Sequence, residues 1–86
     1  MQLGSVVKSI AGSDKGKYYI VIKTESDFAY IVDGKCKTIQ KPKKKKHKHL
    51  QETKLQSDLT KYNPLYDAHI RKELKSLLKI GGCCLG

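Results

Sequence analysis

The first half of the chain alternates short apolar blocks with turn-forming residues. Segments 2–10, 17–23 and 28–34 are rich in β-branched and aromatic residues, which favour strands. Gly, Ser and Asp are concentrated between these segments, as is typical of turns. The pattern predicts three successive strands, the third with Phe28, Tyr30 and Val32 on one face and Ala29 and Ile31 on the other.

Two shorter strands complete the expected sheet. Asp33 and Gly34 favour a tight type I′ hairpin turn, so residues 35–41 are expected to form a fourth strand. A fifth strand is expected around Leu50. Short strands separated by turns predict a mainly β fold, a small SH3-like antiparallel barrel of about five strands in residues 1–54.

The last third of the chain has a helical pattern. Apolar residues recur at the spacing of one helix face, with a capping residue and a proline before them and two glycines after them. We therefore expect a C-terminal amphipathic helix over residues 63–80 that docks on the barrel, after a linker over 55–62 and before a flexible tail over 81–86. The residues behind this prediction are Asn63 as N-cap, Pro64 at the first helical position, Ile70, Leu74, Leu77 and Leu78 as the apolar face, and Gly81 and Gly82 at the end.

The net charge of +10 is concentrated in one part of the sequence. Residues 1–34 contain four lysines and four acids, whereas residues 35–54 contain nine lysines and one acid, Glu52. Such a block repels itself, so it usually serves an anionic partner, and nucleic acid is the foremost class. A solvated charge run without a partner and a localisation signal are the alternatives. Because an expected strand lies on each side, the run at residues 41–50 is interpreted as a loop anchored at both ends.

The remaining chemistry favours a binding protein over an enzyme. Acids are scattered, the histidines of the basic block lie among lysines, and the glycine-rich turn leads into a strand, unlike a P-loop. His47, His49, Cys36, Cys83 and Cys84 lack the spacings of structural zinc sites, so we expect neither metal nor cofactor. An odd cysteine count and the lack of a secretory segment indicate a cytoplasmic protein. No apolar run is long enough to span a bilayer, so we expect no membrane partner, and we also expect no small-molecule substrate.

The segment from Gly4 to Ile22 resembles the KOW motif: an apolar strand, a glycine, a short polar turn, Lys-Gly-Lys and a second apolar strand. With Val32-Asp33-Gly34 and the basic block in the same order, residues 3–52 resemble the KOW-type large-subunit ribosomal proteins of archaea and eukaryotes. The resemblance implies an SH3-like barrel that binds RNA, commonly ribosomal RNA, without catalysis. The matching positions are Gly4, Val6, Val7, Gly12, Asp14, Lys15, Gly16, Lys17, Ile20 and Ile22.

Elementary chemistry suggests how such a segment meets RNA. Gly12 and Gly16 allow backbone conformations that a Cβ would forbid, so the turn around Asp14 can bring its N–H groups and lysines close to a phosphate. A purely structural hairpin turn is the simpler alternative, and both roles are compatible. Lysine is a point charge that suits phosphates better than base edges, so little sequence readout is expected. The expected RNA-binding residues are Lys15, Lys17, Lys35, Lys37, Lys41, Lys43, Lys44, Lys45, Lys46, Lys48, His47 and, as a stacking aromatic, Tyr18.

Two points stay open. Tyr18 and Tyr19 are neighbours on an expected strand, so only one of them should face outward. A protein-interaction module is the alternative function, because SH3-like barrels also take up peptides and the helix could dock on a partner.

Overall fold

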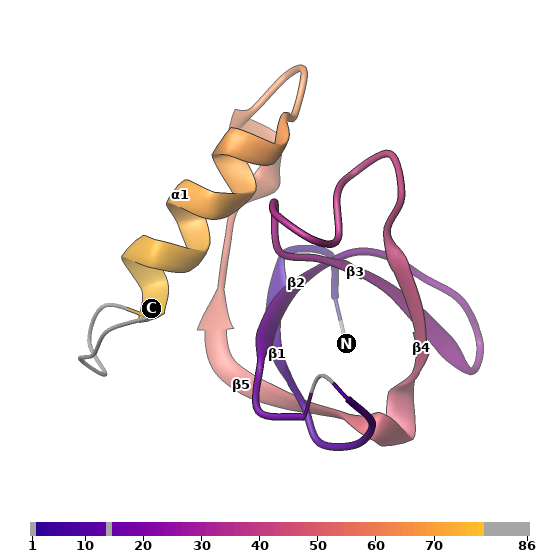
Figure 1. The fold of residues 1–86 in the computed structure, drawn as a ribbon. Helices are drawn as coiled ribbons and strands as arrows, with labels where there is room; N and C mark the ends of the chain where they lie inside the picture. Colours follow the sequence, from indigo (N-terminus) through magenta and orange to yellow (C-terminus); the bar gives the residue numbers. More distant parts are fainter. Residues whose placement is uncertain (1, 14, 79–86) are drawn as a thin grey trace.

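Five strands form one antiparallel sheet in the order β4-β3-β2-β1-β5 (Figure 1). The computed structural model of the protein describes residues 2–13 and 15–78. The strands are β1 (Ser5–Ser9), β2 (Tyr18–Thr24), β3 (Phe28–Val32), β4 (Lys43–Lys46) and β5 (Leu50–Gln56), and the helical elements are η1 (His47–His49), η2 (Leu59–Lys61) and α1 (Asp67–Leu78).

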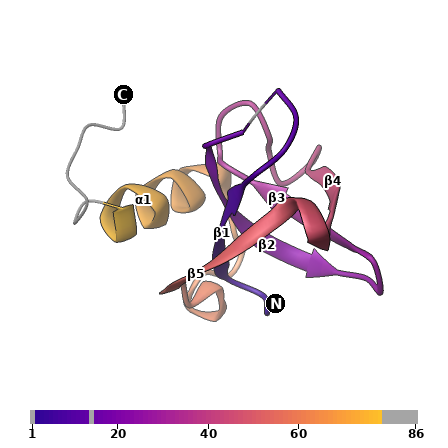
Figure 2. The same cartoon turned by 90° about the horizontal axis from the view of Figure 1, so that it is seen from below.

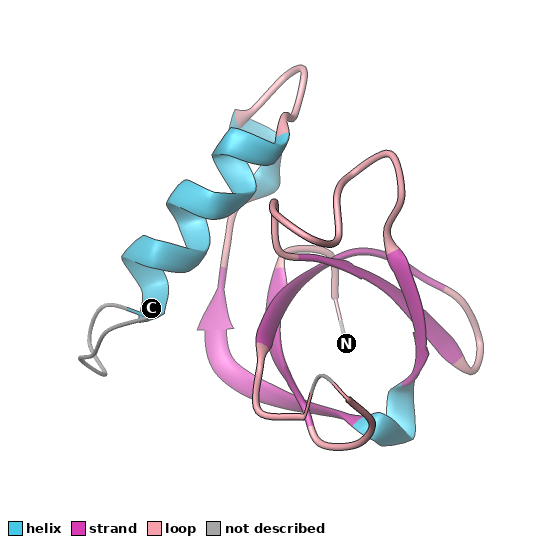
Figure 3. Cartoon of the chain, in the orientation of Figure 1, coloured by secondary structure: helices cyan, strands magenta, loops and turns pink. Residues whose placement is uncertain are grey.

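The sheet curls into a barrel-like ring with the helix on its outside (Figure 3). Within the described residues the hydrogen-bonded ladder does not close, because β4 pairs with β3 and β5 pairs with β1. The expected mainly β fold with five strands and one C-terminal helix is confirmed.

Alternation along the strands creates two apolar clusters on opposite faces of the sheet. Side chains that point into the ring form the first cluster, and their immediate neighbours in sequence point out toward the helix and form the second. Burial of these side chains is the main favourable contribution to folding in so small a chain. The inner cluster contains Val7, Tyr19, Val21, Ala29, Ile31 and Leu50, and the outer cluster contains Val6, Ile20, Val32, Ile70 and Leu74.

The helix docks on the barrel, as predicted. Ile70 and Leu74 are buried in the outer cluster, and Leu77 packs against its rim. The expected start at Asn63 is wrong, because α1 begins at Asp67. The side chain of Leu78 and the expected end at Gly81 and Gly82 lie outside the described residues.

The first turn of α1 supplies its own cap. The backbone N–H of Tyr66 donates to Nδ1 of His69 at 3.0 Å, while the carbonyl of Tyr66 accepts from the N–H of Ile70. This contact resembles one half of a capping box, in which a side chain three residues on returns to the N-cap backbone. The sequence analysis expected an ordinary capping residue, Asn63, and therefore missed the cap from His69.

Residues 35–41 do not form the expected fourth strand. The carboxylate of Asp33 accepts the N–H groups of Lys35 at 2.8 Å and of Lys37 at 2.9 Å, which folds the chain back on itself. Such side-chain acceptors compete with a sheet partner for the same N–H groups. The expected type I′ turn is also absent, because Gly34 has a positive φ but Asp33 does not.

The lysine run is the fourth strand. Lys43 to Lys46 pair with β3, with Ala29 opposite Lys45 and Tyr30 opposite Lys44. The expected anchored loop is therefore wrong for these residues, and the loop lies earlier, over 33–42. The fifth strand around Leu50 is confirmed and extends to Gln56, past the boundary expected at residue 54.

Candidate nucleic-acid interface

Two lysine-bearing loops leave the sheet at the same end. Neighbouring strands are antiparallel, so the β1–β2 and β3–β4 connections emerge together and the β2–β3 connection emerges at the other end. Figure 2 shows the first two connections on one side of the sheet. Lys15 and Lys17 are exposed in one loop, and Lys35, Lys37 and Lys41 lie in the other.

Strand β4 extends the positive charge along the sheet. Lys44 and Lys46 are exposed on its outer face, and Lys48 is exposed on η1. Lys43 is half-buried and lies on the opposite face. We call the following set the basic surface: the exposed residues Lys15, Lys17, Lys35, Lys41, Lys44, Lys46 and Lys48, together with Lys37 of the same loop, which is half-buried.

Lys45 differs from its neighbours because it points into the protein. It is 8% exposed, and its Nζ donates to Oγ of Ser9 at 2.8 Å and to the carbonyl of Ala11 at 2.7 Å. The side chain therefore joins β4 to the end of β1 and to the start of the β1–β2 loop. This position contradicts a direct role in binding an external phosphate.

The imidazole of His47 also makes its hydrogen bonds within the protein. Its Nε2 lies 3.0 Å from the carbonyl oxygen of Glu25 and 2.9 Å from that of Phe28. Carbonyl oxygens only accept, so Nε2 must bear the proton. The backbone N–H of His47 donates to the carbonyl of Asp27 at 3.0 Å. The residue thus attaches η1 to the β2–β3 turn and is not part of the basic surface.

The motif turn has the geometry that glycine permits. Gly12 and Gly16 both have positive φ values, of 86° and 92°. The N–H of Gly16 donates to the carbonyl of Ser9 at 2.8 Å, so the turn is a closed hairpin. The third residue of the predicted motif, Asp14, lies outside the described residues.

Only one of the two neighbouring tyrosines faces outward, as expected. Tyr19 is 2% exposed inside the ring, whereas Tyr18 is half-buried at the rim of the outer cluster. Lys8 Nζ lies 5.8 Å from the centroid of the Tyr18 ring. Tyr18 is therefore mainly a packing residue.

The outer face of β3 presents two aromatic rings that are not among the expected RNA-binding residues. Phe28 and Tyr30 are half-buried and belong to neither apolar cluster. Lys44 Nζ lies 4.5 Å from the Phe28 ring centroid, and Lys23 Nζ lies 5.4 Å from the Tyr30 centroid. The alternation of inward and outward residues along β3 could have predicted that these two rings share the outer face. The position of Lys23 beside Tyr30 could not be predicted in this way, because it depends on a bulge between Val21 and Lys23.

Glu25 orders this outer face. Its Oε1 accepts from the Tyr30 hydroxyl at 2.9 Å and lies 3.8 Å from Lys44 Nζ. The hydrogen bond to Glu25 is the main reason that the pKa of Tyr30 is raised, followed by burial and by the repulsion between the two negative charges.

The helix holds the β3–β4 loop in place. Arg71 Nη1 donates to the carbonyl of Gly34 at 2.6 Å, and Oδ1 of Asp67 accepts from the N–H of Ile39 at 2.8 Å. A Cβ at Gly34 would lie 2.7 Å from both Arg71 Cγ and the Asp67 carbonyl. Glycine is therefore required for the helix to approach this closely. The contacts with the helix hold the backbone of the loop that carries Lys35, Lys37 and Lys41.

A second polar group, Glu73, joins the helix to the segment after β5. Its carboxylate accepts from Ser57 Oγ at 2.8 Å and from the Tyr62 hydroxyl, and it lies 3.3 Å from Lys61 Nζ. Burial by itself raises the pKa of Glu73, but the hydrogen bonds from Tyr62, Ser57 and Lys61 outweigh it and hold the pKa below its usual value. The same contacts raise the pKa values of Tyr62 and Lys61.

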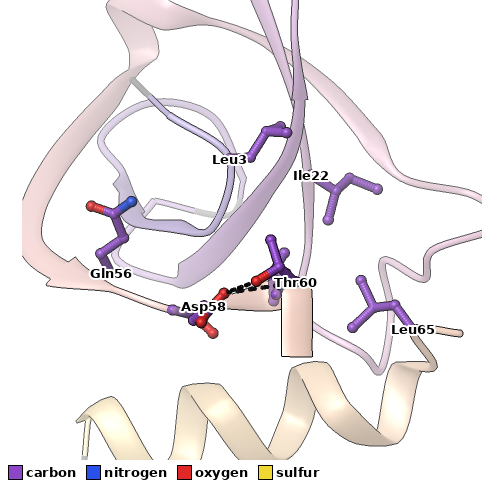
Figure 4. A pocket seen from close by; sticks show the side chains of 8 residues that line it. Leu3, Ile22, Gln56, Asp58, Thr60 and Leu65 are labelled. Atoms are coloured by element: carbon purple, nitrogen blue, oxygen red, sulfur yellow. Dashed lines mark hydrogen bonds between the residues drawn. The ribbon is translucent and has the colours of Figure 1, made fainter. Parts of the chain in front are cut away.

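A mostly apolar hollow lies between the chain before β1, strand β2 and the segments on either side of η2, and no residue of the lysine run lines it. Its volume is about 540 Å³, and Leu3, Ile22 and Leu65 lie around it together with the segment after β5 (Figure 4). In Figure 4, Thr60 and Asp58 lie at its floor, joined by hydrogen bonds.

Comparisons with known proteins do not identify the chain. No family model matches it, and no curated protein matches it. The resemblance to KOW proteins therefore stays a prediction. In the part of the chain that the structure describes, no group of His, Cys, Asp and Glu side chains could hold a metal ion. Nor is any helix there both long and apolar enough to cross a bilayer.

Proposed function

We propose that the protein is a non-catalytic, cytoplasmic RNA-binding module of the KOW type, associated with the ribosome or ribosomal RNA. The observation that supports this most strongly is the basic surface. Two lysine-bearing loops emerge at one end of the sheet, and β4, with two exposed lysines on its outer face, follows the second of these loops. Concentrated lysines on a rigid scaffold suit the phosphates of a folded RNA.

The division of the lysines supports binding by shape and charge. The basic surface contains lysine alone, which contacts phosphates as a point charge and does not offer the planar fork that reads guanine. The β-hairpin pairing of β4 and the helix contacts to the β3–β4 loop fix these residues before RNA arrives. Less ordering entropy is therefore lost on binding than a free tail would lose.

The salt dependence of binding tests the proposal. If six to eight lysines meet phosphates, the logarithm of affinity for a structured RNA should fall with the logarithm of salt with a slope of about −4 to −7. A fluorescence titration across salt concentrations measures this slope. A slope near zero would show that phosphate contacts do not drive binding.

Two matched triple variants locate the surface. Lys44, Lys46 and Lys48 changed to Gln should weaken RNA binding and make the slope less steep by about 2 to 3. Lys54, Lys72 and Lys75 are also exposed, but they lie on β5 and α1. Their change to Gln removes the same charge and should change the slope by less than half as much. Equal effects from both triples would point to unspecific attraction between the whole protein and RNA.

The apolar hollow supports a second candidate, a protein-interaction module. The apolar face of the helix is not available for this role, because Ile70 and Leu74 are buried against the sheet. Leu3 is 59% exposed at the edge of the hollow. Leu3→Glu should abolish binding of a peptide there and leave RNA affinity unchanged, which separates the two candidates.

A further inference from the structure

The outer face of β3 and β4 combines half-buried aromatic rings with lysines on both sides. Phe28 and Tyr30 are two positions apart on one face of β3. Across the ladder, Lys46 is opposite Phe28, and Tyr30 lies between Lys23 of β2 and Lys44 of β4. A row of this composition combines flat apolar faces with cations, which are the two groups that bind an unpaired nucleotide.

These rings lie outside both cores. Neither apolar cluster includes Phe28 or Tyr30, although a chain this short has few large apolar residues to spare. Their contacts are instead with charged side chains: Lys44 over Phe28 at 4.5 Å, and Lys44 and Lys23 over Tyr30 at 6.0 Å and 5.4 Å.

The lysines over the rings can give way to a base. An exposed ammonium over a ring is held more weakly than a stacked nucleobase. Lys44 is about half exposed, with 49% of its side-chain surface accessible, so its flexible stem can move. Its ammonium then reaches the phosphate beside the incoming base, and the charge stays satisfied.

The ring of Tyr30 is oriented before any ligand arrives. Its hydroxyl donates to Glu25 Oε1 at 2.9 Å, and the backbone of Glu25 pairs with Phe28 across the β2–β3 turn at 2.7 Å. The imidazole of His47 bonds to the carbonyls of the same two residues. A turn fastened in this way holds both rings at the surface with little freedom to lose.

We propose that Phe28 and Tyr30 form a stacking platform for unpaired bases of single-stranded RNA, with Lys23, Lys44 and Lys46 contacting the adjoining phosphates. This inference rests on the proposed RNA-binding function and adds a ligand class to it. The loops contact the backbone of structured RNA, whereas the platform takes bases from a loop, bulge or end. Stacking accepts every base because every base has a flat face.

Loss of the aromatic ring tests the platform. Phe28→Leu keeps an apolar, sheet-compatible side chain but cannot stack, so affinity for an oligouridine of about twelve nucleotides should fall about 5- to 100-fold. Affinity for a blunt RNA duplex should stay within about twofold, because its bases are already stacked. Tyr66→Leu is the matched control, because Tyr66 is 59% exposed near the start of α1 and far from β3 in sequence. It should bind both RNAs like the wild type.

A fluorescent reporter gives an independent readout. The chain contains no tryptophan, so Phe28→Trp introduces a single one. Its emission should be quenched when oligouridine stacks on the indole, and affinity should equal or exceed that of the wild type. Thermal melting of each variant checks that the fold is intact.

The outcomes separate the two proposals. Wild-type protein that binds neither RNA overturns the proposed function. Wild-type protein that binds both, with Phe28→Leu equal to it and no quenching in Phe28→Trp, overturns the platform alone. Selective loss of single-strand binding in Phe28→Leu together with quenching supports the platform. If Phe28→Leu does not fold, the quenching measurement decides the question.

Discussion

The two faces of β4 place the same residue type in opposite environments. Lys45 points inward, is 8% exposed and donates to Ser9 and Ala11. Lys44 and Lys46 point outward and are exposed. Four consecutive lysines are therefore not one binding element, because the period of two along a strand assigns alternate residues to structure and to ligand.

The comparison shows that the role of a charged side chain depends on whether its partners lie inside the protein or outside it. Lys45 and Glu73 both find their partners inside the protein, one within the ring and one under the helix. Their removal should destabilise the fold. The outward lysines are exposed, so any contact they make with the protein is weak, and their removal should affect binding and leave stability nearly unchanged.

The largest effect is expected at Lys45. Lys45→Ala removes two hydrogen bonds from a charged donor and leaves a cavity, so the free energy of unfolding should fall by about 2–4 kcal/mol. For a domain of this size that is roughly 10–25 °C in melting temperature. Circular dichroism during heating measures the shift.

Two further variants sharpen this prediction. Lys45→Met keeps the aliphatic stem and loses only the hydrogen bonds, so it should be destabilised less than Lys45→Ala. Lys44→Ala should melt close to the wild type. Equal melting temperatures for Lys44→Ala and Lys45→Ala would contradict the distinction between the two faces.

The second largest effect is expected at Glu73. Glu73→Gln weakens three polar contacts and should lower the free energy of unfolding at neutral pH by about 1–3 kcal/mol. The folded-state pKa of Glu73 is below its usual value, so its contribution is present above about pH 4.5 and is lost as pH falls through the lower folded value. The stability difference between wild type and Glu73→Gln should therefore shrink on acidification.

Urea unfolding of the two proteins at neutral pH and at about pH 3 tests this pH dependence. Asp27→Asn is a suitable control, because Asp27 is exposed on the β2–β3 turn. A difference for Glu73→Gln that stays constant or grows in acid would argue against a carboxylate held in its charged form by Tyr62, Ser57 and Lys61.

A smaller effect is expected for a single outward lysine. Lys44→Gln should lower RNA affinity only a few-fold and make the salt slope less steep by about 0.7–0.9, which corresponds to one phosphate. Lys75→Gln, on the helix, should leave the slope unchanged. Filter binding across several salt concentrations resolves the two slopes. A loss of melting temperature in Lys44→Gln comparable to that of Lys45→Ala would break the comparison.

The smallest effect is expected at Glu25. Glu25→Gln removes a negative charge from the outer face, so RNA affinity should rise about twofold at low salt. The pKa of Tyr30 should also move down toward its ordinary value, because the hydrogen bond to a carboxylate is lost. NMR titration of the Tyr30 ring measures this shift. An unchanged pKa would show that Glu25 does not hold the hydroxyl.

Local sequence patterns were sufficient to predict an element where all residues of a segment favoured the same secondary structure. The first three strands, the fifth strand and the helix face at Ile70 and Leu74 were predicted from apolar periodicity. The fourth strand was missed because lysine has little intrinsic preference for strands. Its pairing comes from β3, and the inward ammonium of Lys45 is compatible with burial only because Ser9 and Ala11 supply acceptors from a distant part of the chain.

The sequence was enough to predict that the candidate site consists of lysines, but not which of them face outward or which side chains lie beside them. Composition indicated the basic block, yet it could not separate Lys45 from Lys44. It also missed Lys23, whose position beside Tyr30 depends on a bulge in β2. Asp67 and Arg71 fasten the β3–β4 loop across about thirty positions of the sequence, a contact that no local pattern reports.

By itself, the sequence determined the number and type of most elements, because short-range periodicity and turn residues act on each segment independently. It also determined that the protein has a strong local excess of positive charge. Only the tertiary structure decided which lysines are internal, which loops share one end of the sheet and which rings remain at the surface. Those features depend on register and on contacts between distant segments, where a shift of one residue would exchange the two faces of every strand.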